Sequence, residues 1–132
     1  MASVFSQVIS GELPGRFVHA DDRAVAFLTV APLNPGHTLV VPRDEVDDWL
    51  DVPADLMAHL TEVSQRVGRA IKQAFGPARV GVVVAGLEVP HCHLHLVPFD
   101  EMAELDFTRV DTDPSPESLD DAQRRITEAL TG

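Results

Sequence analysis

The sequence predicts an α+β fold in a single unit, and two observations carry this prediction. One long stretch places apolar residues at helical spacing, and several short runs around it are rich in β-branched residues. A chain of 132 residues falls within the range of roughly 100 to 200 residues that is usual for one domain. Because 45% of its residues are hydrophobic, the chain has enough apolar material for a core.

The first elements are expected to be a short helix and a hairpin. Apolar residues at positions 4, 5, 8 and 9 recur at helical spacing, and Gly11 and Pro14 end the segment. Residues 16–20 and 24–30 then follow as two β-rich runs. The residues between them, 21–23, suit a tight turn, so we expect antiparallel strands.

A stiff loop and a long helix come next. Prolines within residues 31–36 restrict the backbone before the β-rich run 38–41, which leaves His37 where the loop becomes a strand. Pro53 suits the first turn of a helix, and Gly76 followed by proline stops it. The apolar residues between them step by three or four: Leu56, Leu60, Val63, Val67, Ala70, Ile71 and Ala74.

Two more strands and a second helix complete the prediction. Residues 80–85 form a near-continuous apolar run typical of a buried strand, and residues 91–99 follow as another strand. Residues 111–116 are polar and rich in proline. Apolar residues at positions 119, 122, 126 and 130 then predict a terminal helix. We expect residues 111–132 to pack on the domain formed by residues 1–110.

The strand at 91–99 is expected to carry the chemistry. Successive side chains of a strand point to opposite faces, so His91, His93 and His95 share one face while the residues between them face the core. Each buried imidazole needs partners for two ring nitrogens. Three of them in register are therefore better explained by a functional site than by packing.

A zinc site on this strand is one alternative that the residues leave open. Histidines two positions apart can both reach one ion at about 2.0 to 2.1 Å per bond. His91 and His95 would lie about 13 Å apart along a strand that rises about 3.3 Å per residue. At most two of the three would therefore bind the same ion, and His37 or His59 would have to complete the site.

Charge and composition argue against several classes of partner. A formal net charge of -11 would repel long nucleic acid and anionic membranes, which bind cationic surfaces. No apolar stretch approaches the roughly 18 residues of a membrane span, and the N-terminus lacks the pattern of a secretory signal. The single cysteine, Cys92, leaves no intramolecular disulfide and fits a reducing compartment, so we expect the cytoplasm. A small phosphorylated ligand remains compatible with this charge.

Two motifs resemble those of a known family. Residues 91–97, His-Cys-His-Leu-His-Leu-Val, resemble the histidine triad (HIT) signature, and residues 35–42, Pro-Gly-His-Thr-Leu-Val-Val-Pro, resemble the family's second motif. Both occur in the family's order, and the resemblance covers residues 3–99. It points to the Hint-like bacterial branch and implies a five-stranded antiparallel sheet with a long helix, assembled as a two-fold homodimer.

The resemblance also implies a mechanism. His93 resembles the nucleophile that attacks the α-phosphorus of a nucleotide and forms a transient nucleotidyl-histidine, from which water releases the monophosphate. An imidazole with a pKa of about 6.5 is largely neutral at pH 7, so one nitrogen attacks while the other donates to a backbone carbonyl. His91 and His95 would brace the nucleophile or bind phosphate oxygens, and His37 resembles a fourth, flanking histidine. We predict a hydrolase of purine nucleoside phosphoramidates or dinucleoside polyphosphates that requires no cofactor.

The resemblance assigns further residues to the nucleotide. Four apolar side chains would line the base pocket: Phe5, Val8, Phe27 and Val30. Thr29, Leu87 and Glu88 would lie near the ribose, the phosphate and the leaving group, but the family more often has aspartate at the first position and Gln-Ser or Gln-Thr at the other two. A hydroxyl makes a weaker, uncharged contact, and a carboxylate beside phosphate is repulsive. A nucleotide-binding regulatory module with little turnover is therefore a second alternative.

A structural zinc site is not expected. Relatives that hold zinc use a Cys-x-x-Cys pair where this chain has Ser3 and Ser6, and a histidine where it has Glu45. Glu45 belongs to an acidic run at 44–48, which is expected to be a solvated turn or, with suitable geometry, a site for a hard cation. His19 and His59 are expected to be ordinary surface residues.

Overall fold

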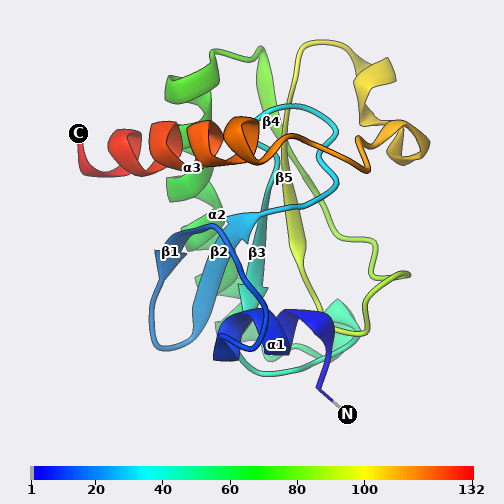
Figure 1. Ribbon diagram of the computed structural model, residues 1–132. Coiled ribbons are helices and arrows are strands. Elements are labelled where there is room, and N and C mark those ends of the chain that lie inside the picture. Colours follow the sequence, from blue (N-terminus) through cyan, green and yellow to red (C-terminus); the bar gives the residue numbers. More distant parts are fainter. Residues whose placement is uncertain (1) are drawn as a thin grey trace.

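A computed structural model describes residues 2–132 and shows a five-stranded sheet with helices on both faces (Figure 1). The strands are β1 (Phe17–Ala20), β2 (Ala24–Leu28), β3 (Thr38–Pro42), β4 (Arg79–Val83) and β5 (Leu94–Phe99). All pair antiparallel, in the order β1-β2-β3-β5-β4. The helices are α1 (Val4–Ser10), α2 (Ala54–Phe75) and α3 (Pro116–Thr131), with short turns η1 (Trp49–Asp51), η2 (Met102–Leu105) and η3 (Phe107–Arg109). The predicted α+β class is confirmed; Met1 lies outside the described residues.

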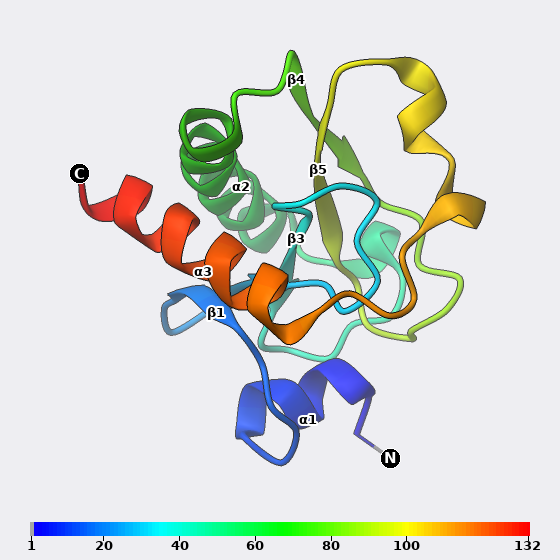
Figure 2. The same cartoon turned by 45° about the horizontal axis from the view of Figure 1, so that its top comes forward.

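Alternation along the strands sends apolar side chains to opposite faces of the sheet. On one face, Ala26 of β2 and Val40 of β3 join the main core, which also contains the buried sides of α2 and α3. On the other face, Phe27 and Leu39 form a smaller cluster with Val8 of α1. Figure 2 shows α2 and α3 together on one side of the molecule, with α1 apart from them. The two faces are therefore covered by different helices.

The long helix α2 is apolar on one side only. Its buried residues are Leu56, Leu60, Val63, Ser64, Val67, Ala70 and Ile71. Gly76 ends it in the left-handed conformation, and the Gly76 N–H donates to the carbonyl of Lys72 at 2.8 Å. Among residues 2–132, no helix is long and apolar enough to cross a membrane.

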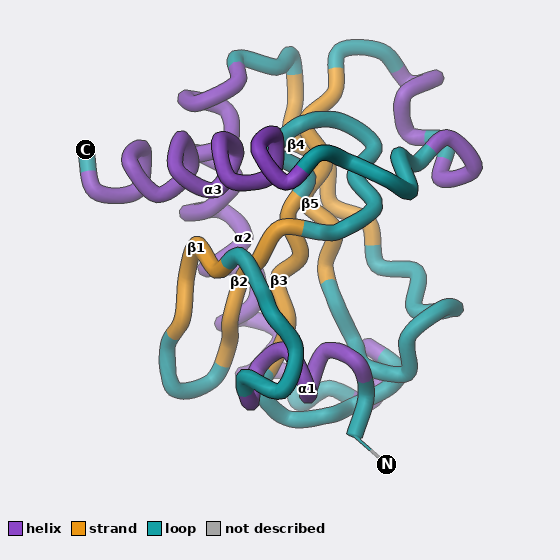
Figure 3. Tube along the Cα trace, viewed as in Figure 1, coloured by secondary structure: helices purple, strands orange, loops and turns teal. Residues whose placement is uncertain are grey.

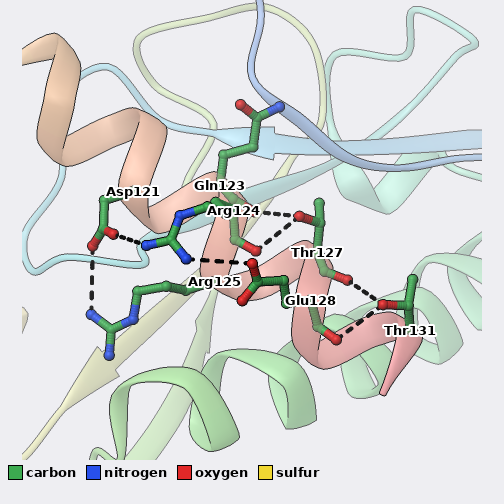
Figure 4. Close-up of polar contacts among 7 residues, drawn as sticks. All are labelled: Asp121, Gln123, Arg124, Arg125, Thr127, Glu128 and Thr131. Carbon is green, nitrogen blue, oxygen red and sulfur yellow. Dashed lines mark hydrogen bonds and ion pairs between the residues drawn. The ribbon is translucent and has the colours of Figure 1, made fainter.

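The terminal helix α3 packs across α2. Its buried residues are Leu119, Ala122 and Ile126. Arg125 fastens it further, since its guanidinium lies 4.2 Å from the ring centroid of Phe75 and donates to a backbone carbonyl at the end of α2. On the outer side, Arg124 pairs with Asp121 and Glu128 (Figure 4). Exposed pairs of this kind contribute about 0 to 1 kcal/mol, so burial is the main force that holds α3 in place.

The boundaries of the strands differ from the prediction, most of all in β5. This strand begins at Leu94 instead of residue 91, after a long loop (Figure 3). The backbone N–H of Cys92 donates to the carbonyl of Val46 at 2.6 Å and not to a neighbouring strand. His91 and His93 therefore lie outside the sheet, in the segment that leads into β5. The other differences are small: β2 ends two residues earlier than predicted, and β4 begins one residue earlier and ends two earlier.

Candidate active site

Three histidines meet on the α1 face of the sheet. His37 directly precedes β3, which pairs with β5 so that Leu39 lies opposite His95. The ring centroids of His37 and His95 are 5.2 Å apart, and those of His95 and His93 are 4.8 Å apart. The residues between the triad histidines point the other way, since Cys92 and Leu94 are buried in the main core. The rings therefore form a row, and the alternation predicts the shared face of His93 and His95 within it.

Gly36 allows the loop to turn His37 into this row. It has φ +98°, which L side chains rarely adopt. A Cβ at this position would lie 2.9 Å from ring atoms of Phe75, which is closer than real contacts allow. Glycine is therefore required here both by the backbone conformation and by space.

Hydrogen bonds determine which nitrogen of each ring carries its proton. The backbone N–H of Leu33 donates to Nδ1 of His37 at 3.0 Å, so this nitrogen is an acceptor. A neutral His37 then carries its proton on Nε2, which donates to Nδ1 of His95 at 2.9 Å. His95 must in turn carry its proton on Nε2, an atom that is not among the buried unpartnered polar atoms of residues 2–132. The pair therefore presents an N–H donor with access to solvent.

Burial keeps both of these rings neutral. Burial first, and the nearby His95 second, lower the pKa of His37 to about 3. Burial also lowers the pKa of His95 to about 4, with a further contribution from His93. At pH 7 the donor of His95 is therefore a neutral imidazole N–H and not an imidazolium.

His93 has the geometry of an oriented nucleophile. Its Nδ1 lies 2.8 Å from the carbonyl oxygen of His91, which can only accept, so Nδ1 carries the proton and Nε2 keeps its lone pair. This is the backbone bond that the sequence analysis expects. Burial lowers the pKa of His93, while the bond to the His91 carbonyl and the negative charge of Glu88 oppose that effect. The ring is 6% exposed, and Nε2 retains access to solvent.

His91 does not lie on an open face, which corrects part of the prediction. It is fully buried, and both ring nitrogens are engaged within the protein. Nε2 donates to the carbonyl of Pro42 at 2.7 Å, and Nδ1 lies 2.7 Å from the hydroxyl of Ser3. It therefore has no nitrogen free for a phosphate oxygen. Its carbonyl accepts from Nδ1 of His93, so His91 orients the His93 ring.

The N-terminus of α1 is fastened to His91 through a polar network. Ser3 caps the helix by accepting from the backbone N–H of Ser6 at 3.0 Å. The backbone N–H of Ser3 and the hydroxyl of Ser6 donate to one carboxylate oxygen of Glu45, at 2.7 and 2.6 Å. These bonds lower the pKa of Glu45 to about 2. Glu45 is therefore an anchor of α1 and not part of a merely solvated turn.

This anchoring places an aromatic wall beside His93. The ring centroid of Phe5 is 4.8 Å from that of His93 and 5.6 Å from that of Phe27. Val8 and Phe27 lie in the same cluster and are 8% and 4% exposed. Val30 is 72% exposed and lies outside this cluster. Three of the four residues predicted for a base pocket are therefore brought together, and one is not.

Thr29, Leu87 and Glu88, which depart from the family pattern, differ in how they relate to the histidines. The Thr29 hydroxyl accepts from the backbone N–H of Ala31 at 3.2 Å, so it supports the local turn. Leu87 is 95% exposed, at the tip of the loop before the histidines. Glu88 is exposed in the same loop, and its charge acts on the pKa of His93. Of the three, Glu88 has the clearest link to the site.

Phe107 also lies beside the site, and the sequence analysis did not single it out. Its ring centroid is 4.9 Å from that of His95 and 6.1 Å from that of His37. It belongs to η3, after the end of β5, in a region where no strand or helix was expected. The only signal in the sequence is an isolated aromatic residue within an acidic segment.

His19 and His59 are not ordinary surface residues, which is a second correction. Their Nε2 atoms lie 2.7 and 2.9 Å from the same carboxylate oxygen of Asp21. Burial raises the pKa of Asp21, but hydrogen bonds from His19, from two backbone N–H groups and from His59 outweigh it and hold the pKa well below its usual range. The cluster ties the first hairpin to α2, away from the α1 face. In residues 2–132, no group of three or more histidine, cysteine, aspartate or glutamate side chains is arranged to hold a metal ion.

Comparisons with known proteins agree with this fold. The chain matches the HIT domain over residues 10–102. It is 34% identical over 100 residues to an uncharacterized HIT-like protein of Saccharolobus solfataricus, and the aligned part is 72% of each chain.

Solved structures show the same fold. A zinc-bound histidine triad family protein from Mycobacterium smegmatis superposes with a TM-score of 0.84 at 27% identity, covering 99% of this chain and 94% of that one. A hypothetical histidine triad nucleotide-binding protein from Sulfolobus tokodaii superposes with a TM-score of 0.83 at 27% identity, covering 96% and 91%. With the HIT domain spanning most of its length and the histidine row in place, the chain belongs to the histidine triad family and is a HIT-type nucleotide-binding protein.

Proposed function

We propose that the protein is a hydrolase that cleaves at the α-phosphorus of a purine nucleotide conjugate, such as a nucleoside phosphoramidate or a dinucleoside polyphosphate. One observation carries this proposal. His93 is held by its Nδ1–H on a backbone carbonyl, so its Nε2 lone pair is open beside the N–H donor of His95. An oriented neutral imidazole next to a fixed donor is suited to covalent attack on phosphorus.

The reaction proceeds in two displacements. Nε2 of His93 attacks phosphorus, and the bond to the leaving group breaks with its electron pair going to the leaving atom. That atom accepts a hydrogen bond from His95 and takes its proton from solvent. Water then attacks the phosphorus of the nucleotidyl-histidine, the phosphorus–nitrogen bond breaks, and the electron pair returns to Nε2. The water proton goes to solvent, so the products are nucleoside monophosphate and the protonated leaving group.

His37 supports this chemistry through its neighbour. Its Nε2–H bond to His95 leaves the outer nitrogen of His95 as a donor in both displacements. Because imidazole supplies the nucleophile and a donor, the proposal requires no cofactor and no metal. We also propose that Phe5, Val8 and Phe27 form one wall for the base, since their cluster adjoins His93.

The experiment compares wild type with His93→Ala, and with His59→Ala as a histidine control outside the site. Release of monophosphate is measured from an adenosine 5'-phosphoramidate and from a diadenosine polyphosphate, after far-UV circular dichroism has confirmed folding. We expect His93→Ala to lose about 10³-fold or more of turnover, and His59→Ala to keep it. Wild type quenched in alkaline denaturant should carry one nucleotidyl group on His93. If wild type releases no monophosphate from either substrate, the hydrolase proposal is wrong.

A regulatory module that binds nucleotide with little turnover is the second candidate. Thr29 supports it, because its hydroxyl, which accepts from the backbone N–H of Ala31, offers a ribose only an uncharged contact where the family more often has aspartate. Measurable nucleotide binding without monophosphate release would favour this candidate. Zinc on the histidine row is a third candidate, but His37 and His95 are already bonded to each other. Stoichiometric zinc in purified protein that is lost in His95→Ala would support it.

We further propose that the protein is a homodimer and that it works in the cytoplasm. We assign it to the Hint-like bacterial branch, with residues 1–110 as the domain and residues 111–132 packed on it as an extension. For the dimer, β4 is an edge strand that pairs with β5 alone, and Val82 on it is 57% exposed. An edge strand offers unpaired backbone groups to a second chain. Light scattering coupled to size-exclusion chromatography would give the mass, and a monomer would contradict the dimer.

A further inference from the structure

The turn that leads into β3 holds the ring of His37 through a backbone group. Residues 34–37 form a β-turn, in which the N–H of His37 donates to the carbonyl of Asn34 at 3.1 Å and Gly36 has φ +98°. Leu33, directly before this turn, donates its N–H to Nδ1 of His37 at 3.0 Å. The proton of a neutral His37 therefore stays on Nε2, facing Nδ1 of His95, only while the turn keeps Leu33 in place.

The side chain of Asn34 links this turn to the strand that carries His95. Its amide donates to the carbonyl of Pro98 at 2.8 Å and to the carboxylate of Glu104 at 3.0 Å. Pro98 lies in β5, as His95 does. The same oxygen of Glu104 accepts from the backbone N–H of Asp100 at 3.1 Å, which fixes the carboxylate at the end of β5. Both hydrogens of the Asn34 amide are therefore bonded to groups at the end of this strand.

The ladder between the strands does not make this connection. The backbone pairs of β3 and β5 end before the turn, at Thr38 opposite Leu96. The bonds from Asn34 therefore lie beyond the ladder. A separate bond holds the loop on its other side, where the backbone N–H of Asp111 donates to the carbonyl of Pro32 at 2.9 Å. Because this bond remains when the Asn34 amide is removed, the loop stays attached and the loss is confined to the turn.

We propose that Asn34 is a positioning residue of the active site, which holds the turn against β5 and so keeps the outer nitrogen of His95 as an N–H donor. The inference rests on the proposed function, because this donor serves the leaving atom in the reaction. Without the Asn34 amide, the Leu33 N–H is no longer held on His37, and His37 can carry its proton on Nδ1. Its Nε2 then accepts from Nδ1 of His95, whose outer nitrogen is left without a proton. A leaving atom beside that nitrogen would lose its hydrogen bond.

The first measurement needs no substrate. In protein labelled with ¹⁵N at histidine, long-range proton–nitrogen correlation spectra at pH 7 distinguish protonated from unprotonated ring nitrogens. Wild type should carry the proton on Nε2 in both His37 and His95, and Asn34→Ala should move it to Nδ1 of His95 in part or all of the molecules. Gln123→Ala is the matched control, because the Gln123 amide also donates to a strand carbonyl, that of Phe17 at 2.9 Å, but in β1 at the edge of the sheet. It should leave both rings unchanged.

The second measurement is hydrolysis of an adenosine 5'-phosphoramidate. Asn34→Ala should lower kcat about 10-fold or more and leave KM within about threefold, because the aromatic wall of the proposed base pocket is untouched. Asn34→Asp places two carboxylates together and should lose at least as much. Adding Glu104→Gln to it exchanges the amide and the carboxylate, so part of the activity should return.

Wild-type tautomers in Asn34→Ala would show that the amide only packs the loop, and the proposal would be wrong. A changed tautomer with unchanged kcat would overturn the role in the reaction. If the alanine variant does not fold, the comparison of Asn34→Asp with the double variant decides instead, and equal activity of the two contradicts the proposal. No turnover in wild type would overturn the proposed function alone, because the spectra then still decide whether Asn34 sets the donor of His95.

Discussion

The neutral histidines of the site predict a loss of stability in mild acid. The pKa of His37 is about 3 and that of His95 about 4 in the folded protein, whereas both groups have a reference value of 6.5. Because the folded-state pKa is depressed, the unfolded chain binds protons that the folded protein does not. Their contribution to stability is complete above pH 6.5 and is lost as the pH falls from 6.5 through the folded-state values.

The size of the effect follows from the shifts. Each additional proton bound by the unfolded chain changes the free energy of unfolding by about 1.4 kcal/mol per pH unit. At pH 5, which is about 1.5 units below the unfolded value, each ring lowers stability by about 2 kcal/mol and the pair by about 4 kcal/mol. A domain has a free energy of unfolding of only about 5 to 15 kcal/mol, so the change is large. His93 acts in the same direction, since its pKa is also lowered.

The assay is urea unfolding followed by far-UV circular dichroism at intervals from pH 7.5 to 5. Glu45 and Asp21 also have lowered pKa values, but the ordinary pKa values of these carboxyls, 4.5 and 3.8, place their effect below this window. His37→Gln removes one titrating ring, so its slope should be shallower than that of wild type by about 1.4 kcal/mol per pH unit. A flat wild-type profile, or an unchanged slope in His37→Gln, would mean that these rings accept protons in the folded protein. The assignment of neutral tautomers would then be wrong.

Three further variants test the site and the packing of the helices. Gly36→Ala should destabilise the protein by about 1 to 3 kcal/mol in urea unfolding, because of its positive φ and its close approach to a phenylalanine ring of α2; an unchanged midpoint would contradict this. Arg125→Ala should lower stability by about 1 to 2 kcal/mol, whereas alanine at the neighbouring arginine on the outer side should change it little (Figure 4). The triple variant Ser3→Cys, Ser6→Cys and Glu45→His should bind one zinc ion by elemental analysis, since both hydroxyls lie within 3.5 Å of one imidazole nitrogen. If the triple variant contains no zinc, the three new side chains and the His91 imidazole do not converge closely enough to bind the ion.

The sequence predicted the structure best where its residues repeat with the period of a helix or strand and one face of that element is buried. The helical spacing of α2 and the alternation of His93 and His95 with core leucines both led to correct placements, because each pattern has a single face that can be buried. The start of β5 was wrong by three residues. The alternation of side chains extends beyond the hydrogen-bonded ladder, and Cys92 pairs with a loop residue that no local pattern could identify.

The sequence by itself determined the α+β class, the helix and strand types and the face that the triad histidines share, since periodicity and turn residues are local properties. Only the tertiary structure decided how the histidines are used. Burial of His91 between Pro42 and Ser3 removed it from any ligand, and the bond between His37 and His95 fixed the donor of the site. Phe107 reached His95 only through chain reversal after β5. These roles depend on contacts between backbone carbonyls, hydroxyls and rings that lie far apart in the sequence. The spacing of residues along the chain does not predict such long-range contacts.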